Sequence, residues 1–457
     1  MARLLKSLRN FLGSNPSSSP TTLPSTPSLS PSTVSAPSRF PRSIDTDFSV
    51  FREGDRVVIN NVKRRQPMLT APLRRGHKID TPRGILDPDR IIGRGPREII
   101  PTHKGTRFLV TLPTLEQYIS MTPRHVTPIY AKDASVIVSL LDLHVAQPGE
   151  GDHTHGPAPL QILESGTGHG ALTLHLSRAI QAANTLPPAL PSASQVKYLE
   201  QPPEEPKDTE EDIEQDQAEL QQQEQKQEQW DTWRATRKAI IHTVEVSPIF
   251  SRHAEKLIRG FRRGIYAGNI DFYVGRVENW VSDQIRKNSS SQSQPFQPFL
   301  THAILDMPSA HLRIPHVASV LKPHGILTVF MPSVTQITEC AMYIRKQGVP
   351  LELDKVVELG TGISGGRTWD VRFAVKKSKA DPGWDSANDP SGSEVVGEES
   401  SSESVGGEGE ASAQTGPGGN VKEEPVLVCR PLAGQLIGAG GFVGIWRKLH
   451  IPSSSGV

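Results

Sequence analysis

Leu160-Gln-Ile-Leu-Glu-Ser-Gly-Thr-Gly-His-Gly170 is the stretch of this chain that decides its fold. The apolar run at its start predicts a buried strand, which ends at Glu164. Glycines at 166, 168 and 170 permit a tight turn and let a ligand approach the backbone closely. An amphipathic helix is predicted next, because apolar side chains share one face: Leu172, Leu176, Ala179, Ile180 and Ala183. The glycine spacing is G-x-G-x-G, which differs from the G-x-G-x-x-G of dinucleotide-binding proteins.

Predicted strands and helices alternate after this stretch. Strands are expected at 240–246, 270–274, 301–306 and 326–331, and helices at 250–263, 314–321 and 335–347. This alternation predicts an α/β fold with a parallel, doubly wound sheet. Further strands are expected at 353–359, 370–375 and 441–447. The last two have no helix between them, so we expect an antiparallel hairpin with an acidic insertion at its tip.

Acidic residues follow three of the predicted strands. Glu245 ends the strand at 240–246, Glu278 follows the strand at 270–274, and Asp306 ends the strand at 301–306. Ligands of open α/β sheets bind beyond the carboxyl ends of the strands, where a carboxylate can accept hydrogen bonds from ribose hydroxyls. These positions therefore predict a binding site for a nucleoside-containing ligand.

Charge is strongly segregated along the 457 residues. The net charge is +1, but residues 200–228 carry 12 acidic and 2 basic residues, and residues 381–424 carry 11 acidic and 1 basic. The rest of the chain is therefore basic, which predicts a polyanionic partner. The two cysteines, Cys340 and Cys429, predict neither a disulfide framework nor a zinc site. No apolar run is long enough to predict a transmembrane helix.

The composition divides the chain into five parts. Residues 1–47 are expected to be a presequence and a disordered linker, because an amphipathic helix at 1–13 with no acidic residue fits mitochondrial targeting. A small β-rich module is expected at 48–112, a catalytic domain at 113–377 with a disordered insertion at 185–229, and a disordered acidic insertion at 378–424. Part of the insertion at 185–229 could instead form a solvated helix, since Gln and Glu are fair helix formers. The final strand of the sheet is expected within 425–450. The module carries four arginines expected to contact RNA phosphates: Arg64, Arg65, Arg74 and Arg75.

The motifs together resemble one family. The glycine-rich stretch resembles the first motif of S-adenosylmethionine (SAM) methyltransferases. From Phe51 to Lys448, leaving out the insertions, the chain resembles the catalytic subunit of tRNA (adenine-58-N1) methyltransferase. The resemblance rests on five further stretches: Gly54-Asp-Arg-Val-Val-Ile, Gly105-Thr-Arg-Phe-Leu-Val-Thr-Leu-Pro-Thr-Leu-Glu-Gln-Tyr118, Ile129-Tyr-Ala-Lys-Asp-Ala-Ser-Val-Ile137, Ile304-Leu-Asp-Met-Pro308 and Trp369-Asp-Val-Arg372.

The resemblance implies a Rossmann-like, seven-stranded SAM-dependent methyltransferase domain that methylates N1 of adenosine 58 in tRNA. It implies Asp306 as the catalytic residue and a cofactor site made of Glu164, Gly166, Thr167, Gly168, His169, Gly170, Glu245, Glu278 and Asp306. Within that site, Glu278 stands where such enzymes hold the adenine amino group. Tyr130 is a candidate for contact with the target base, and no metal is implied. The family works as tetramers, so the chain is expected to form a homotetramer or a heterotetramer with a non-catalytic partner. Mitochondrial localisation would favour the first arrangement, and nuclear localisation the second.

Alternative functions remain open at the level of sequence. A non-catalytic tRNA-binding partner subunit would keep the fold but lose the cofactor motif, which is present here. A SAM methyltransferase that acts on another RNA, a protein or a small molecule would keep the same motif, although the basic module favours RNA. An oxidoreductase that uses a dinucleotide is disfavoured by the glycine spacing.

Overall fold

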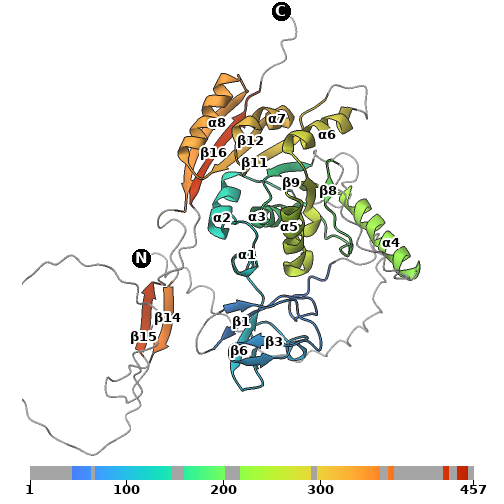
Figure 1. Ribbon diagram of the computed structural model, residues 1–457, viewed down its shortest axis with the longest axis vertical. Coiled ribbons are helices and arrows are strands. Elements are labelled where there is room, and N and C mark those ends of the chain that lie inside the picture. Colours follow the sequence, from blue (N-terminus) through green and yellow to red (C-terminus); the bar gives the residue numbers. More distant parts are fainter. Residues whose placement is uncertain are drawn as a thin grey trace, which may run out of the picture. The chain divides into compact units, whose positions relative to one another are not determined.

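The central sheet is built around the predicted glycine-rich stretch. The computed structural model describes residues 44–62, 67–146, 159–200, 217–289, 296–360, 369–374, 426–431 and 440–450. Within these ranges eight strands form one sheet in the order β13-β16-β12-β11-β7-β9-β10-β8 (Figure 1). Their bounds are β7 Leu160–Ser165, β8 Lys197–Tyr198, β9 Ala239–Glu245, β10 Ile270–Val274, β11 Leu300–Leu305, β12 Leu321–Met331, β13 Leu351–Leu359 and β16 Gly441–Lys448.

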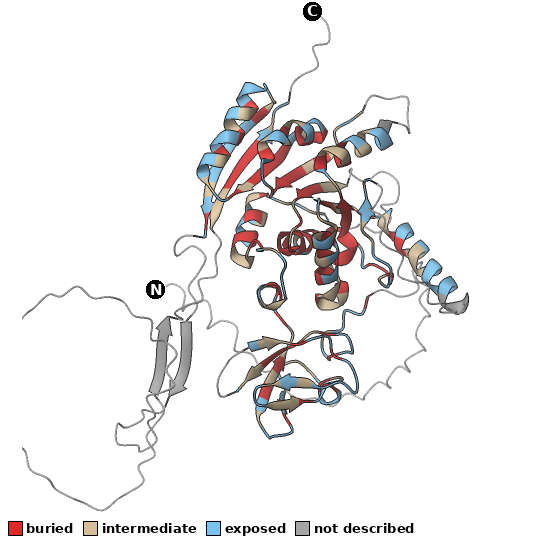
Figure 2. Ribbon diagram, viewed as in Figure 1, coloured by how far each residue is buried: buried red, intermediate tan, exposed pale blue. Residues whose placement is uncertain are grey.

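Helices enclose this sheet from both faces. Successive residues of β7 point to opposite sides, so Ile162 and Leu163 belong to different hydrophobic clusters. The Ile162 cluster contains buried side chains of α2 (Ala131–Leu140), α3 (Ala171–Ile180) and α5 (Pro248–Gly260). The Leu163 cluster contains those of α6 (Val277–Ser289), α7 (Ile314–Val320) and α8 (Val334–Lys346). Buried residues accordingly fill the central strands, and the outward faces of α4 and α8 are largely exposed (Figure 2). The α/β, Rossmann-like class predicted from the sequence is confirmed.

A small antiparallel sheet precedes this domain. Four of its strands pair in the order β2-β1-β6-β5, with bounds Val58–Asn61 (β1), Pro67–Leu69 (β2), Ile99–Pro101 (β5) and Arg107–Thr111 (β6). A separate hairpin joins β3 (Ile79–Thr81) to β4 (Gly84–Leu86). The module has its own core, in which Phe51, Ile59 and Val110 are fully buried. Helix α1 (Leu115–Met121) follows, and its N-terminus is closed by a capping box between Thr114 and Gln117.

The carboxyl-terminal pairing differs from the hairpin predicted above. Strand β16 lies between β12 and β13 and is antiparallel to both. The predicted strand at 370–375 is present as β14 (Trp369–Ala374), but it pairs with β15 (Val426–Pro431) in a separate two-stranded sheet. Strand β15 was not predicted, whereas the strand expected at 441–447 is present as β16. Residues 378–424 lie outside the described part of the chain, as do the targeting segment at 1–13 and residues 63–66.

The predicted disordered insertion at 185–229 is a second difference. Residues 185–200 follow a defined path that ends in β8, and helix α4 (Gln217–Arg234) begins inside the predicted insertion. The helix is held by Trp230 and Trp233, which are both buried and three positions apart on one side of it. The Glu/Gln-rich composition concealed these two anchors, because they stand at the very end of the polar run. The sheet gains its eighth strand from the same insertion.

Candidate functional site

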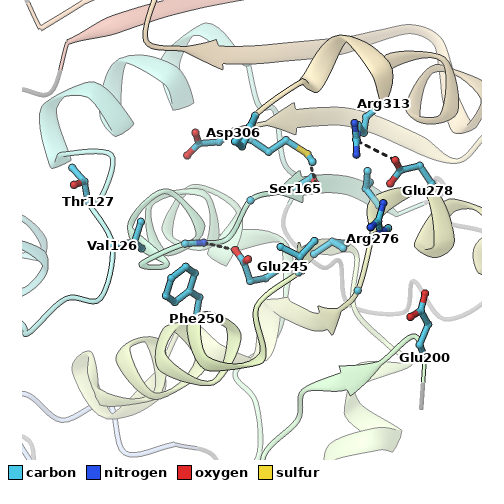
Figure 3. A pocket seen from close by; sticks show the side chains of 18 residues that line it. Val126, Thr127, Ser165, Glu200, Glu245, Phe250, Arg276, Glu278, Asp306 and Arg313 are labelled. Atoms are coloured by element: carbon cyan, nitrogen blue, oxygen red, sulfur yellow. Dashed lines mark hydrogen bonds and ion pairs between the residues drawn. The ribbon is translucent and has the colours of Figure 1, made fainter. Parts of the chain in front are cut away.

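The site lies at one edge of the sheet, where the ends of β7, β9, β10 and β11 meet. Pairing aligns Ser165 with Leu305 on one side and with Val244 on the other. Strands β9 and β10 lie on one side of β7 within the sheet, and β11 lies on its other side. The strand order therefore reverses at β7. Such a switch point is where open α/β sheets bind ligands. A cavity of about 690 Å³ opens here (Figure 3).

The glycine-rich turn shapes the floor of this cavity. Gly166 has φ +97°, and a Cβ added to it would lie 1.9 Å from the carbonyl oxygen of Asp306. A side chain is therefore excluded where the ends of β7 and β11 meet. Gly170 begins α3 in a left-handed conformation and packs against Ala254 of α5. Only Gly166 and Gly168 of the three glycines line the cavity.

Glu245 is held in a fixed orientation by two backbone N–H groups. The amide of Gly168 donates to Oε2 at 2.9 Å, and the amide of Ser247 donates to Oε1 at 3.0 Å. Each carboxylate oxygen keeps a further acceptor position, because an ionised carboxylate can accept about four hydrogen bonds. Glu245 lines the cavity, so these positions are available to ligand hydroxyls.

Asp306 faces the same cavity from the end of β11 (Figure 3). Its backbone N–H donates to the carbonyl of Ser165 at 2.9 Å, which fixes the end of β11 against β7. Burial, with a further contribution from the negative charge of Glu245, raises the pKa of Asp306 to about 7. The carboxyl group therefore titrates near neutral pH.

The opposite end of the cavity carries a mixture of charges. Glu278, at the start of α6, has Oε1 3.0 Å from Nε of Arg313. Arg276 also lines this end, and so does Glu200 from the insertion (Figure 3). No group of histidine, cysteine and carboxylate side chains suited to a metal ion occurs in the described ranges.

Comparisons with known proteins agree with this arrangement. No protein family profile matches the chain. The sequence is similar to the tRNA (adenine(58)-N(1))-methyltransferase TrmI of Thermus thermophilus, with 24% identity over 293 residues that cover 64% of this chain and 79% of the relative. The same protein from a second strain of that organism matches equally, at 24% identity over 293 residues. The relationship is that of a distant homologue.

Two solved structures align with most of this chain, both at a TM-score below 0.5. A SAM-dependent O-methyltransferase of Thermotoga maritima aligns over 88% of this chain and 96% of its own, with 15% identity and a TM-score of 0.46. The tRNA (m1A58) methyltransferase TrmI of Aquifex aeolicus aligns over 88% of this chain and 100% of its own, with 15% identity and a TM-score of 0.44.

The structure brings together five of the predicted site residues. Gly166, Gly168, Glu245, Glu278 and Asp306 all line the cavity. Several neighbours were not predicted as site residues, although they line it too: Val126, Thr127, Glu200, Phe250, Arg276, Met307 and Arg313. Most of these come from loops and helix starts that carry no recognisable spacing.

Glu164 and Thr167 lie beneath the turn rather than in the cavity. Oε2 of Glu164 accepts hydrogen bonds from the hydroxyls of Thr173 at 2.6 Å and Thr243 at 2.8 Å, and Oγ1 of Thr167 lies 2.6 Å from Oγ1 of Thr243. Burial raises the pKa of Glu164 to about 8. These side chains tie the turn to α3 and β9, so their geometry indicates a supporting role in place of the predicted contact with cofactor.

His169 and Tyr130 also stand outside the residues that line the cavity. Nδ1 of His169 lies 3.2 Å from Nε2 of His253, and burial lowers the pKa of His169 to about 4, so the imidazole is neutral at physiological pH. The hydroxyl of Tyr130 accepts a hydrogen bond from Arg124 at 3.0 Å on the exposed side of the loop. Val126 and Thr127, from this loop, line the cavity instead.

Only two of the four arginines predicted to contact RNA lie in the described part of the chain. Arg64 and Arg65 fall within 63–66 and so lie outside the described residues. Arg74 and Arg75 are exposed on the module. Nη1 of Arg75 lies 3.5 Å from Oδ1 of Asp89, a weak surface pair that leaves the guanidinium accessible.

Proposed function

We propose that this chain binds SAM in the cavity and transfers its methyl group to N1 of adenosine 58 in tRNA. The observation that carries the proposal is the pair of carboxylates on the two sides of the glycine-rich turn. Glu245 is held by backbone N–H groups for contact with hydroxyls, and Asp306 is half-buried with a raised pKa. The similarity to the Thermus tRNA (adenine(58)-N(1))-methyltransferase supports the choice of reaction and substrate.

The residues that line the cavity fit the proposed cofactor. A volume of about 690 Å³ is in the range of sites for ligands of this size. Glu245 would accept hydrogen bonds from the ribose hydroxyls, and Gly166 and Gly168 leave room beside the backbone for the amino-acid portion. Glu278 and Arg313 would flank the adenine ring at the other end. When bound, the cofactor supplies an electrophilic methyl group on a sulfonium.

Asp306 would stabilise the charge that develops on the target base. N1 of adenine has a lone pair at neutral pH, so attack requires alignment and no strong base. The adenine ring becomes cationic as the methyl group is transferred. A carboxylate beside the exocyclic amino group would accept its hydrogen bond and stabilise that charge more in the transition state than in the ground state.

The basic module would hold the RNA. Residues 52–110 carry 14 basic and 6 acidic residues, which suits contact with phosphates. Adenosine 58 lies inside a folded loop of tRNA, so the base has to be extruded before it can reach the cavity. A tetramer, of one subunit type or with a partner subunit, is the assembly that the family resemblance favours.

Methyl transfer to two transcripts tests the proposal. The purified full-length chain is incubated with labelled SAM and an unmodified tRNA transcript, or with the same transcript carrying uridine at position 58. We expect SAM to bind by calorimetry, and label to appear as 1-methyladenosine in the first transcript alone. Binding without transfer would favour a non-catalytic subunit or another substrate, and equal labelling of both transcripts would rule out position 58.

A further inference from the structure

The insertion contributes an acidic side chain to the cavity. Glu200 lies at its rim, at the end that also contains Glu278 and Arg276 (Figure 3). We propose that Glu200 is a further cofactor-contacting residue, which accepts a hydrogen bond from the exocyclic amino group of the adenine ring. This inference rests on the proposed use of SAM. It assigns a binding role to a segment whose composition predicts none.

A series of contacts fixes the path of the chain toward Glu200. The carboxylate of Glu255 on α5 accepts hydrogen bonds from the hydroxyl of Ser194 at 2.5 Å and from the backbone N–H of Gln195 at 2.7 Å. Arg259, one turn later on the same helix, donates to the carbonyls of Pro191 at 2.6 Å and Ala193 at 2.7 Å. The insertion is thus bound to the domain just before it reaches the sheet.

Strand β8 then aligns the insertion with the cavity wall. Lys197 and Tyr198 pair in parallel with the end of β10, and the N–H of Leu199 donates to the carbonyl of Val274 at 3.0 Å. The side chain of Leu199 packs closely on Gly275, where an added Cβ would meet it at 2.9 to 3.2 Å. Gly275 itself lines the cavity. Leu199 therefore packs on the cavity wall, and Glu200 is the next residue in the chain.

The exocyclic amino group of adenine has two N–H donors, so Glu200 can accept one of them beside Glu278. Both oxygens of Glu245 hold backbone N–H groups near the middle of the cavity, and Oε1 of Glu278 faces Arg313. Oε1 of Glu200 accepts a hydrogen bond from Asn279, the residue after Glu278, which turns the carboxylate toward α6. Asp306 stands at the far end (Figure 3). With the ribose at Glu245 and the methyl group toward Asp306, the adenine ring extends to Glu200.

A double-mutant cycle between Glu200 and the ligand tests this contact. The probes are S-adenosylhomocysteine and its 6-deamino analogue, in which hydrogen replaces the amino group. Their Kd values are measured by calorimetry for the wild-type chain and for Glu200→Ala. We expect the wild-type chain to bind the deamino analogue about tenfold more weakly, since a charge-assisted hydrogen bond is lost. In Glu200→Ala the same comparison should give about threefold or less.

A matched control variant shows whether an effect on the Kd ratio is specific to Glu200. Glu224→Ala removes an exposed carboxylate from α4 of the same insertion and should keep the wild-type ratio of the two Kd values. If Glu200→Ala keeps that ratio as well, Glu200 makes no contact with the amino group and the inference is overturned. If the wild-type chain binds neither probe, the proposed cofactor itself is refuted, and the inference with it.

Discussion

Asp306 combines a half-buried position with a proposed chemical task that requires charge. Its pKa of about 7 means that the ionised form predominates only above neutral pH in the free site. A sulfonium nearby would favour the carboxylate and lower this pKa. In the proposed site this carboxyl group would become charged as the sulfonium binds, which limits the cost of a partly desolvated negative charge.

The first prediction concerns this charge. Because the carboxylate is the active form, kcat/KM should rise with pH through about 7 and be lost as pH falls below that value. At saturating SAM the inflection should move to lower pH. Asp306→Asn keeps a hydrogen-bonding oxygen without the charge, so single-turnover methylation should fall about 100-fold and lose this pH dependence. A variant that works at nearly the wild-type rate would show that Asp306 only positions the base.

Glu164 gives a prediction about stability. Its pKa rises from 4.5 to about 8 on folding, so the folded chain binds this proton more tightly than the unfolded chain. Its contribution is largest below about pH 4.5 and is lost as pH rises toward 8, with a slope of about 1.4 kcal/mol per pH unit. Glu164→Gln cannot ionise, and its amide oxygen can still accept from Thr173 and Thr243. The variant should therefore lose less stability than the wild-type chain between pH 5.5 and 8.5.

Denaturant unfolding at several pH values checks this expectation. Asp306 contributes a slope of the same sign in both proteins, so the difference between them reports Glu164 alone. Parallel curves for the two proteins would mean that Glu164 is ionised in the folded state at neutral pH.

Helix α4 is the element whose importance the composition hides. Trp233 is 1% exposed, donates from Nε1 to the hydroxyl of Thr185 at 2.9 Å, and packs so closely on Gly268 that an added Cβ would meet its ring at 2.5 Å. Trp233→Ala should therefore destabilise the chain by about 3 to 5 kcal/mol, as expected for a fully buried aromatic side chain. Leu220→Ala on the same helix, where Leu220 is 43% exposed, is the control and should change stability little. Equal midpoints of urea unfolding for wild type and Trp233→Ala would show that α4 is dispensable.

Local signals explain which elements the sequence could predict. The unit from β7 to α3, and the carboxylates at the ends of β9 and β11, follow from apolar runs, glycines and polar strand ends that lie close together in the chain. Glu200 and Val126 reach the cavity only through contacts with residues distant in sequence, so no local pattern indicates them. Glu164 and His169 fall within the motif, but the turn directs their side chains away from the cavity. A position within the glycine-rich motif therefore does not tell whether a residue lines the cavity or supports the turn from beneath.

At the scale of the whole molecule, the proposed activity requires the basic module to contact the phosphates of the tRNA. Arg74→Ala combined with Arg75→Ala should weaken tRNA binding and reduce the slope of log Kd against log salt by about 1 to 2, since each phosphate contact adds about one unit. The affinity for SAM should not change. Filter binding at salt concentrations from about 50 to about 200 mM measures the slope. Arg345→Ala combined with Lys346→Ala, on exposed α8, removes the same charge and should leave it unaltered.

An unchanged slope in the Arg74 and Arg75 variant would mean that this part of the module faces solvent in the complex. An equal loss in the α8 variant would indicate that the whole surface attracts RNA without a defined path. The module also contacts the catalytic domain through Arg263, whose guanidinium donates to both oxygens of Asp55 at 2.8 Å. The arginines proposed to contact RNA are thus different from Asp55, which contacts the catalytic domain.

The two residues of β8 have a consequence for how molecules of this protein behave toward each other. All five residues of β10 are buried, four of them are apolar or aromatic, and without β8 this strand would be the open edge of the sheet. An uncovered edge strand recruits strands from other molecules and leads to aggregation. The insertion would then protect the protein from aggregation. Variants that lack the insertion should therefore be tested for solubility at high concentration as well as for turnover.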